Sequence, residues 1–222
     1  MLKSILVGFG SAFLLCAMAL AQDVKPPLFA VKSDHGAVIY HNEPGNKFAF
    51  EIPGKEIKGG LTPMNTFRFA VDGQIINIRF AKVEDISGAK KTTNPVEILQ
   101  AHQKWETDFQ SKISGGNLPL EAGGIEVVTV QSSEKLAANF WVITSPEADK
   151  SGNDRQCFLA TVVGNKILVL GAPLKQNEDQ QILHNYLTGI IKSLAFAQAE
   201  PKKTMPALPA RTTKKKTVSQ QK

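Results

Sequence analysis

A period-two alternation of apolar and polar residues, repeated in short segments, most constrains how this chain can fold. In an extended strand this spacing places the apolar side chains on one face. Segments 37–42 and 47–52 form one such pair, and segments 64–71 and 74–83 form a second pair around Asp72-Gly73. Asp-Gly is typical of a type I′ turn, because both of its residues tolerate a positive φ. The sequence therefore predicts two antiparallel hairpins.

A first helix is predicted after the second hairpin. Asn94 can cap it, Pro95 suits its first turn, and Glu97 completes a pattern like a capping box. An apolar stripe then runs along it at three- and four-residue spacing: Leu99, His102, Trp105 (or Glu106), Phe109 and Ile113. Ser114-Gly115-Gly116 ends the helix. Such a stripe predicts that one side of the helix packs against other elements.

Four more strands and a second helix are predicted beyond this point. The strands are expected at 125–131, 136–144, 156–163 and 166–171. Asn177 opens the second helix, and Glu178 and Asp179 stand in its first turn, where the helix dipole favours acidic side chains. Apolar residues between Ile182 and Leu194 form its broad buried face.

The order of elements indicates an α+β fold. Four strands, a helix, four strands and a helix follow one another through mostly short connections. Short turns make neighbouring strands antiparallel, and a sheet is a natural partner for the apolar sides of the helices. We therefore expect a single antiparallel sheet of about seven to eight strands with two principal helices packed on it.

Two segments carry a resemblance to a known fold. Phe48–Pro53 resembles the F-x-F-x-x-P entry of Mog1/PsbP-like domains, and Lys166–Pro173 followed by a helix is similar to their C-terminal part. The resemblance covers roughly residues 36–195 as a pattern of elements. It implies an α/β/α sandwich, with non-enzymatic accessory or binding roles common among relatives, and it transfers no functional residue to this chain.

The first 21 residues have the features of a cleavable signal peptide. Lys3 is positively charged, an apolar stretch runs from Ile5 to Leu20, and Ala19-Leu20-Ala21 provides small residues for signal peptidase. Cleavage between Ala21 and Gln22 is expected. The alternative, a retained membrane anchor, is disfavoured because the apolar stretch is shorter than the ~20 residues that cross a bilayer.

Cysteine usage agrees with this interpretation. Cys16 lies within the signal peptide, and Leu15 stands where a lipoprotein signal has a small residue, so lipidation is the lesser alternative. Cleavage leaves Cys157 as the single thiol, which excludes an internal disulfide. Cys157 lies on a predicted strand with apolar neighbours, where burial would raise its pKa, so we expect a packing role and not a nucleophile.

The positive charge is concentrated at the C-terminus. Residues 197–222 hold seven basic side chains and one acidic one, which equals the whole net charge of +6. We expect a signal peptide at 1–21, an N-terminal lead segment at 22–35, a single α+β domain at 36–196 and a disordered basic tail rich in Pro and Lys at 197–222. The side chains that could contact anionic surfaces are Lys202, Lys203, Arg211, Lys214, Lys215 and Lys216. The alternative is a solubilising extension.

No motif for catalysis, a cofactor or a metal is recognised in the chain. The histidines, at 35, 41, 102 and 184, form neither H-x-H nor H-E-x-x-H, and no G-x-S-x-G elbow occurs. Glu106 and Asp108 are two residues apart on a helix and do not face each other. Trp105 and Trp141 are expected in the core, with His102 at its edge.

These observations favour an exported, non-catalytic binding or accessory protein of a bacterial cell envelope, periplasmic or secreted. Its partner would be an unidentified protein or an anionic envelope component. The tail could contact the membrane surface, and nucleic acid is a disfavoured partner. The alternative is a secreted or periplasmic hydrolase with a site assembled from loops. A pocket lined by converging polar groups would favour the enzyme, and a filled sheet face would favour the accessory role.

Overall fold

The structure, a computed structural model, describes residues 26–64 and 66–197. Four strands form a small sheet in the order β1-β2-β3-β11: β1 Leu28–Ser33, β2 Gly36–Glu43, β3 Asn46–Pro53 and β11 Ala195–Phe196. Seven strands form a large sheet in the order β4-β5-β6-β10-β9-β8-β7: β4 Ile57–Leu61, β5 Phe67–Val71, β6 Gln74–Lys82, β7 Leu120–Thr129, β8 Lys135–Thr144, β9 Asn153–Val163 and β10 Lys166–Lys175. The helices are α2 Pro95–Ser114 and α3 Gln180–Lys192, with 3-10 turns at Val83–Asp85 and Ala89–Lys91.

The expectation of a single sheet is wrong. Both predicted hairpins form, but the first belongs to the small sheet and the second to the large one. The second hairpin joins the rest of the large sheet because β6 also pairs with β10. In the small sheet, β3 pairs with the short strand β11. These pairings join segments that are far apart in the sequence, so no turn motif predicts them. The strand β1 lies within residues 22–35, where we expected a lead segment.

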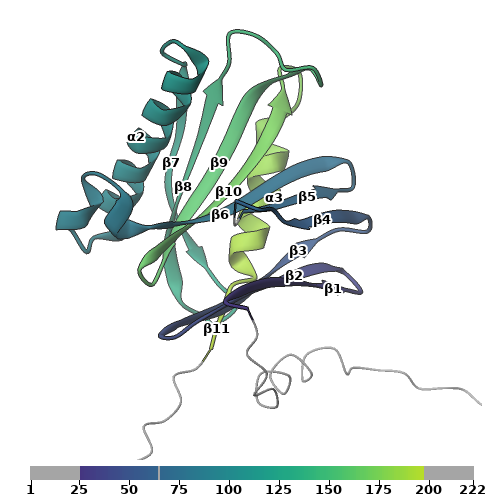
Figure 1. Ribbon diagram of the computed structural model, residues 1–222, viewed down its shortest axis with the longest axis vertical. Helices are drawn as coiled ribbons and strands as arrows, with labels where there is room; N and C mark the ends of the chain where they lie inside the picture. Colours follow the sequence, from purple (N-terminus) through teal and green to yellow (C-terminus); the bar gives the residue numbers. More distant parts are fainter. Residues whose placement is uncertain (1–25, 65, 198–222) are drawn as a thin grey trace, which may run out of the picture.

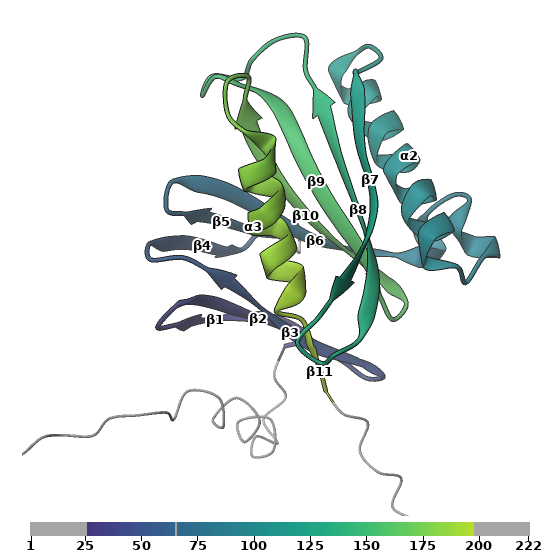
Figure 2. The ribbon, with the colours of Figure 1, turned by 180° about the vertical axis from the view of Figure 1, so that it is seen from behind.

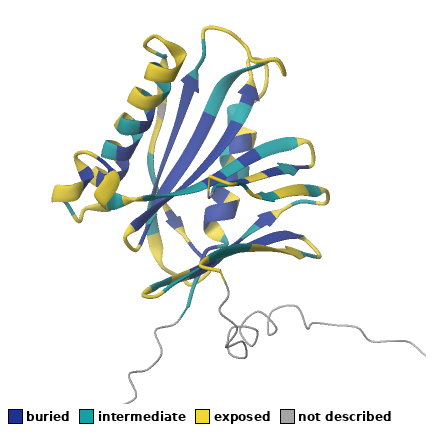
Figure 3. Ribbon diagram, in the orientation of Figure 1, coloured by how far each residue is buried: buried dark blue, intermediate teal, exposed yellow. Residues whose placement is uncertain are grey.

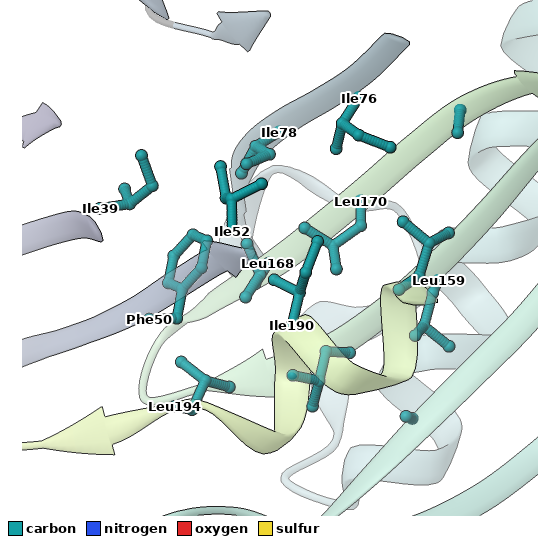
Figure 4. Close-up of a cluster of buried hydrophobic side chains, with 14 of the residues drawn as sticks. Ile39, Phe50, Ile52, Ile76, Ile78, Leu159, Leu168, Leu170, Ile190 and Leu194 are labelled. Atoms are coloured by element: carbon teal, nitrogen blue, oxygen red, sulfur yellow. The ribbon is translucent and has the colours of Figure 1, made fainter. Parts of the chain in front are cut away.

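The two helices cover opposite faces of the large sheet (Figures 1 and 2). On one face, α3 and the small sheet enclose the larger apolar core, in which Phe50, Ile52, Leu170 and Ile190 meet (Figure 4). On the other face, α2 covers a smaller core that contains Trp141. The central strands are therefore buried on both faces, while the outer side of α2 is exposed (Figure 3). The antiparallel strands and the two principal helices are thus as expected.

Local signals placed the turn and the first helix correctly. Asp72 has φ 49° and Gly73 has φ 88°, as a type I′ turn requires. Asn94 caps α2 by accepting a hydrogen bond from the amide of Val96 at 3.0 Å. The cap of α3 is Asp179, which accepts from the amide of Gln181, and not Asn177 as expected. The helix starts later because Glu178 instead accepts from the amide of Lys175, within the preceding turn.

The apolar stripe of α2 is buried only in its first half. Leu99 and His102 are fully buried, but Phe109 is 43% exposed and Ile113 is 67% exposed, which corrects the prediction of a continuous buried stripe. Within residues 26–64 and 66–197, none of the helices is both long and apolar enough to cross a bilayer.

Candidate binding cleft

A cleft of about 370 Å³ lies between the β5–β6 turn, the end of β10 and the first half of α3. Four apolar side chains line it: Val71, Leu174, Ile182 and Leu183. Three of them are buried, but Ile182 is 71% exposed at the rim. The polar side chains in its lining are Asp72, Gln74, Glu178, Asp179 and Tyr186. We call this site the acidic cleft, because its described lining holds three carboxylates and no basic side chain.

The predicted type I′ turn between β5 and β6 places Asp72 at the cleft. Its Oδ1 accepts hydrogen bonds from the amides of Glu56 at 2.8 Å and Lys55 at 3.1 Å. These hydrogen bonds, first that from Glu56 and then that from Lys55, lower the pKa of Asp72 below its usual value. The same side chain therefore completes the turn and supplies a fixed negative charge.

The other two carboxylates lie where β10 leads into α3. Glu178 accepts from the amide of Lys175 at 3.0 Å, and Asp179 accepts from the amide of Gln181 at 2.8 Å. The guanidinium of Arg155 donates to the carbonyls of Lys175, Gln176 and Glu178 at 2.6–3.0 Å. The loop between β10 and α3 is thus fixed by side chains at several points, and this wall of the cleft is preorganised.

Tyr186 connects the cleft to the small sheet. Its hydroxyl donates a hydrogen bond to the carbonyl of Pro53 at 2.8 Å. Burial, and secondarily the charge of Asp72, raises the pKa of Tyr186 to about 12. The phenol is therefore protonated at neutral pH. General acid–base catalysis works best with a pKa near the working pH, whereas Asp72 and Tyr186 are both shifted away from neutrality. Asp72 therefore contributes a negative charge next to the apolar side chains of the cleft.

A second polar cluster lies beneath α2. Arg79 of β6 forms an ion pair with Glu106 of α2, and Gln110 donates to the same carboxylate at 2.8 Å. The Glu106 side chain is fully buried, while that of Arg79 is 30% exposed. Helical spacing presents Glu106 as an alternative to Trp105 on the stripe and as a neighbour of Asp108, and it does not predict this ion pair. The one signal for this ion pair in the sequence is Arg79, a charged residue on the face of the large sheet that α2 covers.

His102 lies beside this ion pair, in the core and not at its edge. It is fully buried, and neither ring nitrogen has a hydrogen-bond partner. The ring centroids of His102 and Trp141 are 5.8 Å apart, and Trp141 is fully buried as expected. Burial, and then the charge of Arg79, lowers the pKa of His102 to about 3. The imidazole is therefore neutral over the physiological range.

The remaining residues singled out in the sequence do not converge. Cys157 is fully buried, as expected, and burial raises its pKa to about 12. His41 is buried against Phe48, whereas His35 is exposed. Among the described residues, no three or more His, Cys, Asp or Glu side chains are grouped so that they could hold a metal ion.

Some predictions concern residues outside the part of the chain that the structure describes. These are the cleavage site at Ala21 and Gln22, and the tail side chains Lys202, Lys203, Arg211, Lys214, Lys215 and Lys216.

Comparisons with known proteins yield a structural likeness. No family model matches the sequence, and no curated protein matches it. Among solved structures, the chain is similar to the solution structure of cyanobacterial PsbP (CyanoP) from Synechocystis sp. PCC 6803. The match covers 82% of this chain and 99% of that one, with 8% sequence identity and a TM-score of 0.41. This likeness transfers no partner or activity to this chain.

Proposed function

We propose that this chain is an exported, non-catalytic accessory protein of the cell envelope that binds a partner through the acidic cleft. The observation that carries the proposal is the lining of the cleft, where three carboxylates surround an apolar floor. Such a surface favours a partner that presents a cationic group next to an apolar one. The filling of both faces of the large sheet by α2 and α3 supports the same interpretation.

The basic tail has a separate role in this proposal. Its lysines would attract anionic components of the envelope, such as lipid head groups or wall polymers, through long-range electrostatics. The domain would then bind its partner close to that surface. Raising the salt concentration should weaken the contact between the tail and the anionic surface, because the electrostatic screening length falls to about 8 Å at physiological ionic strength.

Isosteric neutralisation of the cleft tests the proposal. The cleft variant carries Asp72→Asn, Glu178→Gln and Asp179→Asn, because each amide keeps an oxygen that can accept the existing backbone hydrogen bond. The control variant carries Glu84→Gln, Asp108→Asn and Glu147→Gln, which remove the same charge from exposed positions elsewhere.

Both variants and the wild-type protein are used to capture partners from the native envelope fraction at low salt. We expect one partner to be retained by the wild-type protein and the control variant and lost by the cleft variant. Equal retention by all three proteins would contradict the proposal. Hydrolysis of an ester, peptide or glycoside substrate by the purified chain would favour the enzyme alternative.

A further inference from the structure

The C-terminal half of α2 carries a row of large apolar side chains, and this half of the helix lies mostly at the surface (Figure 3). Phe109 is 43% exposed and Ile113 is 67% exposed. The ring of Phe109 stacks on that of Trp105, with the ring centroids 5.6 Å apart. The three residues follow one another at four-residue spacing, so their side chains form one ridge along the helix. Large apolar side chains grouped at a surface are typical of an interaction site. We call this row the apolar ridge.

Charged side chains of alternating sign run along one edge of the apolar ridge. Lys104, Asp108 and Lys112 each directly precede a residue of the ridge, so they follow it at the same four-residue spacing. All three are exposed. Lys104 and Asp108 form an ion pair at 3.0 Å within the helix, whereas Lys112 has no ion-pair partner among the residues that the structure describes. An edge that presents both signs of charge favours a partner that also carries both signs.

A second copy of α2, laid antiparallel, matches the ridge and its charged edge in one register. In two helices related by a two-fold axis, the same edges of the helices meet. If the axis is level with Gln110, Asp108 of each copy lies opposite Lys112 of the other. At 1.5 Å per residue, the ridge side chains of the two copies then alternate about every 3 Å along the helices. If the axis were level with Phe109, the ridge side chains would meet head-on. Ion pairing and interleaving therefore select the same register.

We propose that two copies of this chain pack antiparallel through the apolar ridge of α2, about a two-fold axis level with Gln110. Two ion pairs between Asp108 and Lys112 fix the register, and the ridge supplies the apolar burial. Three side chains from each copy bury less than the ~1,200 Å² of a stable interface, so the dimer is weak and depends on concentration. Because α2 and α3 cover opposite faces of the large sheet (Figures 1 and 2), the contact leaves the acidic cleft open, and the dimer presents two clefts.

Sedimentation equilibrium of the mature chain at increasing concentration tests the apolar part of the contact. The wild-type protein should shift from monomer to dimer, and Ile113→Asp should stay a monomer because it places a charge in the ridge. Val31→Asp makes a comparable apolar-to-acidic change at an exposed position of the small sheet, away from α2, and should dimerise like the wild type. A wild-type protein that stays monomeric at every concentration would overturn the proposal, and so would equal dimerisation of the two variants.

Charge reversal tests the register. Asp108→Lys and Lys112→Asp, each made alone, should lose the dimer, because like charges would then meet at both edge pairs. In an equal mixture of the two variants, the new lysine of one chain lies opposite the new aspartate of the other, and the two unchanged residues also form a pair of opposite charges. The mixture should therefore form a heterodimer. A mixture that stays monomeric would overturn the proposed register.

Two further measurements separate this inference from other occupants and from the proposed function. If the wild-type protein stays monomeric but binds phosphatidylglycerol vesicles, and Ile113→Asp does not bind them, the ridge is a lipid contact and the proposal is overturned. The cleft variant described above should dimerise like the wild type, and Ile113→Asp should still capture the partner of the cleft. The failure of either proposal therefore leaves the other standing.

Discussion

The unpartnered histidine beneath α2 should make the protein sensitive to mild acid. His102 is fully buried, has no hydrogen-bond partner on either ring nitrogen, and faces the ion pair of Arg79 and Glu106. Its pKa falls from 6.5 to about 3 in the folded protein. Below pH 6.5 the unfolded chain therefore binds a proton at this position that the folded chain does not bind.

The sign and the size of the effect follow from this difference. Because the unfolded state binds more protons, the free energy of unfolding decreases as the pH falls, by about 1.4 kcal/mol per pH unit. The loss begins near pH 6.5 and ends near pH 3, the two pKa values of His102. Between pH 7 and pH 5 it amounts to about 2 kcal/mol. The range from pH 7 to pH 5 lies above the pH at which carboxylates such as Asp72 take up protons.

Urea unfolding of the wild-type protein and of His102→Leu at pH 7, 6 and 5 measures the effect. Leucine removes the titrating group without breaking a hydrogen bond, so the variant should fold and should lose about 2 kcal/mol less than the wild type across this range. The comparison cancels contributions of other groups, including His41, whose pKa burial also lowers. His35→Leu, at an exposed position, is the control. Parallel pH curves for the wild type and His102→Leu would refute the reasoning.

Three further predictions follow from the sequence and from the buried groups. Protein exported by the native host should begin at Gln22, and mass spectrometry that finds Met1 in the exported fraction would contradict cleavage. Cys157 should resist a thiol reagent in the folded protein and react at once after unfolding, because it is fully buried and its pKa is raised to about 12; Cys157→Ser should cost about 1–3 kcal/mol in urea unfolding. Glu106→Gln should lower the free energy of unfolding by about 3 kcal/mol, because the charge of Arg79 would lose its partner under α2. Glu84→Gln, in an exposed ion pair with Lys82, is its control and should leave stability unchanged.

The candidate site was only partly visible in the sequence. Asp72 was identified as a turn residue, and Glu178 and Asp179 as acidic residues of a helix start, each for a local reason. Their common position around one cleft depends on β6 pairing with β10, which brings the β5–β6 turn next to the start of α3. No spacing in the sequence encodes that proximity.

The ion pair beneath α2 was missed for the same reason. Arg79 and Glu106 are 27 residues apart and belong to different elements. Helical spacing relates Glu106 to its neighbours on α2, and strand alternation relates Arg79 to its neighbours on β6. Neither pattern specifies which side of the helix meets which face of the sheet.

Local signals in the sequence are sufficient to define some of the elements. Alternation and the Asp72-Gly73 turn define the second hairpin, because a type I′ turn needs residues that tolerate positive φ. Asn94 defines the start of α2, because its side chain satisfies an amide that the helix leaves unpaired. The division of the strands into two sheets is not predictable from such local signals. That division depends on backbone pairing between distant segments, such as β3 with β11, and on the packing of one side of α3 against both sheets, and no local preference specifies either.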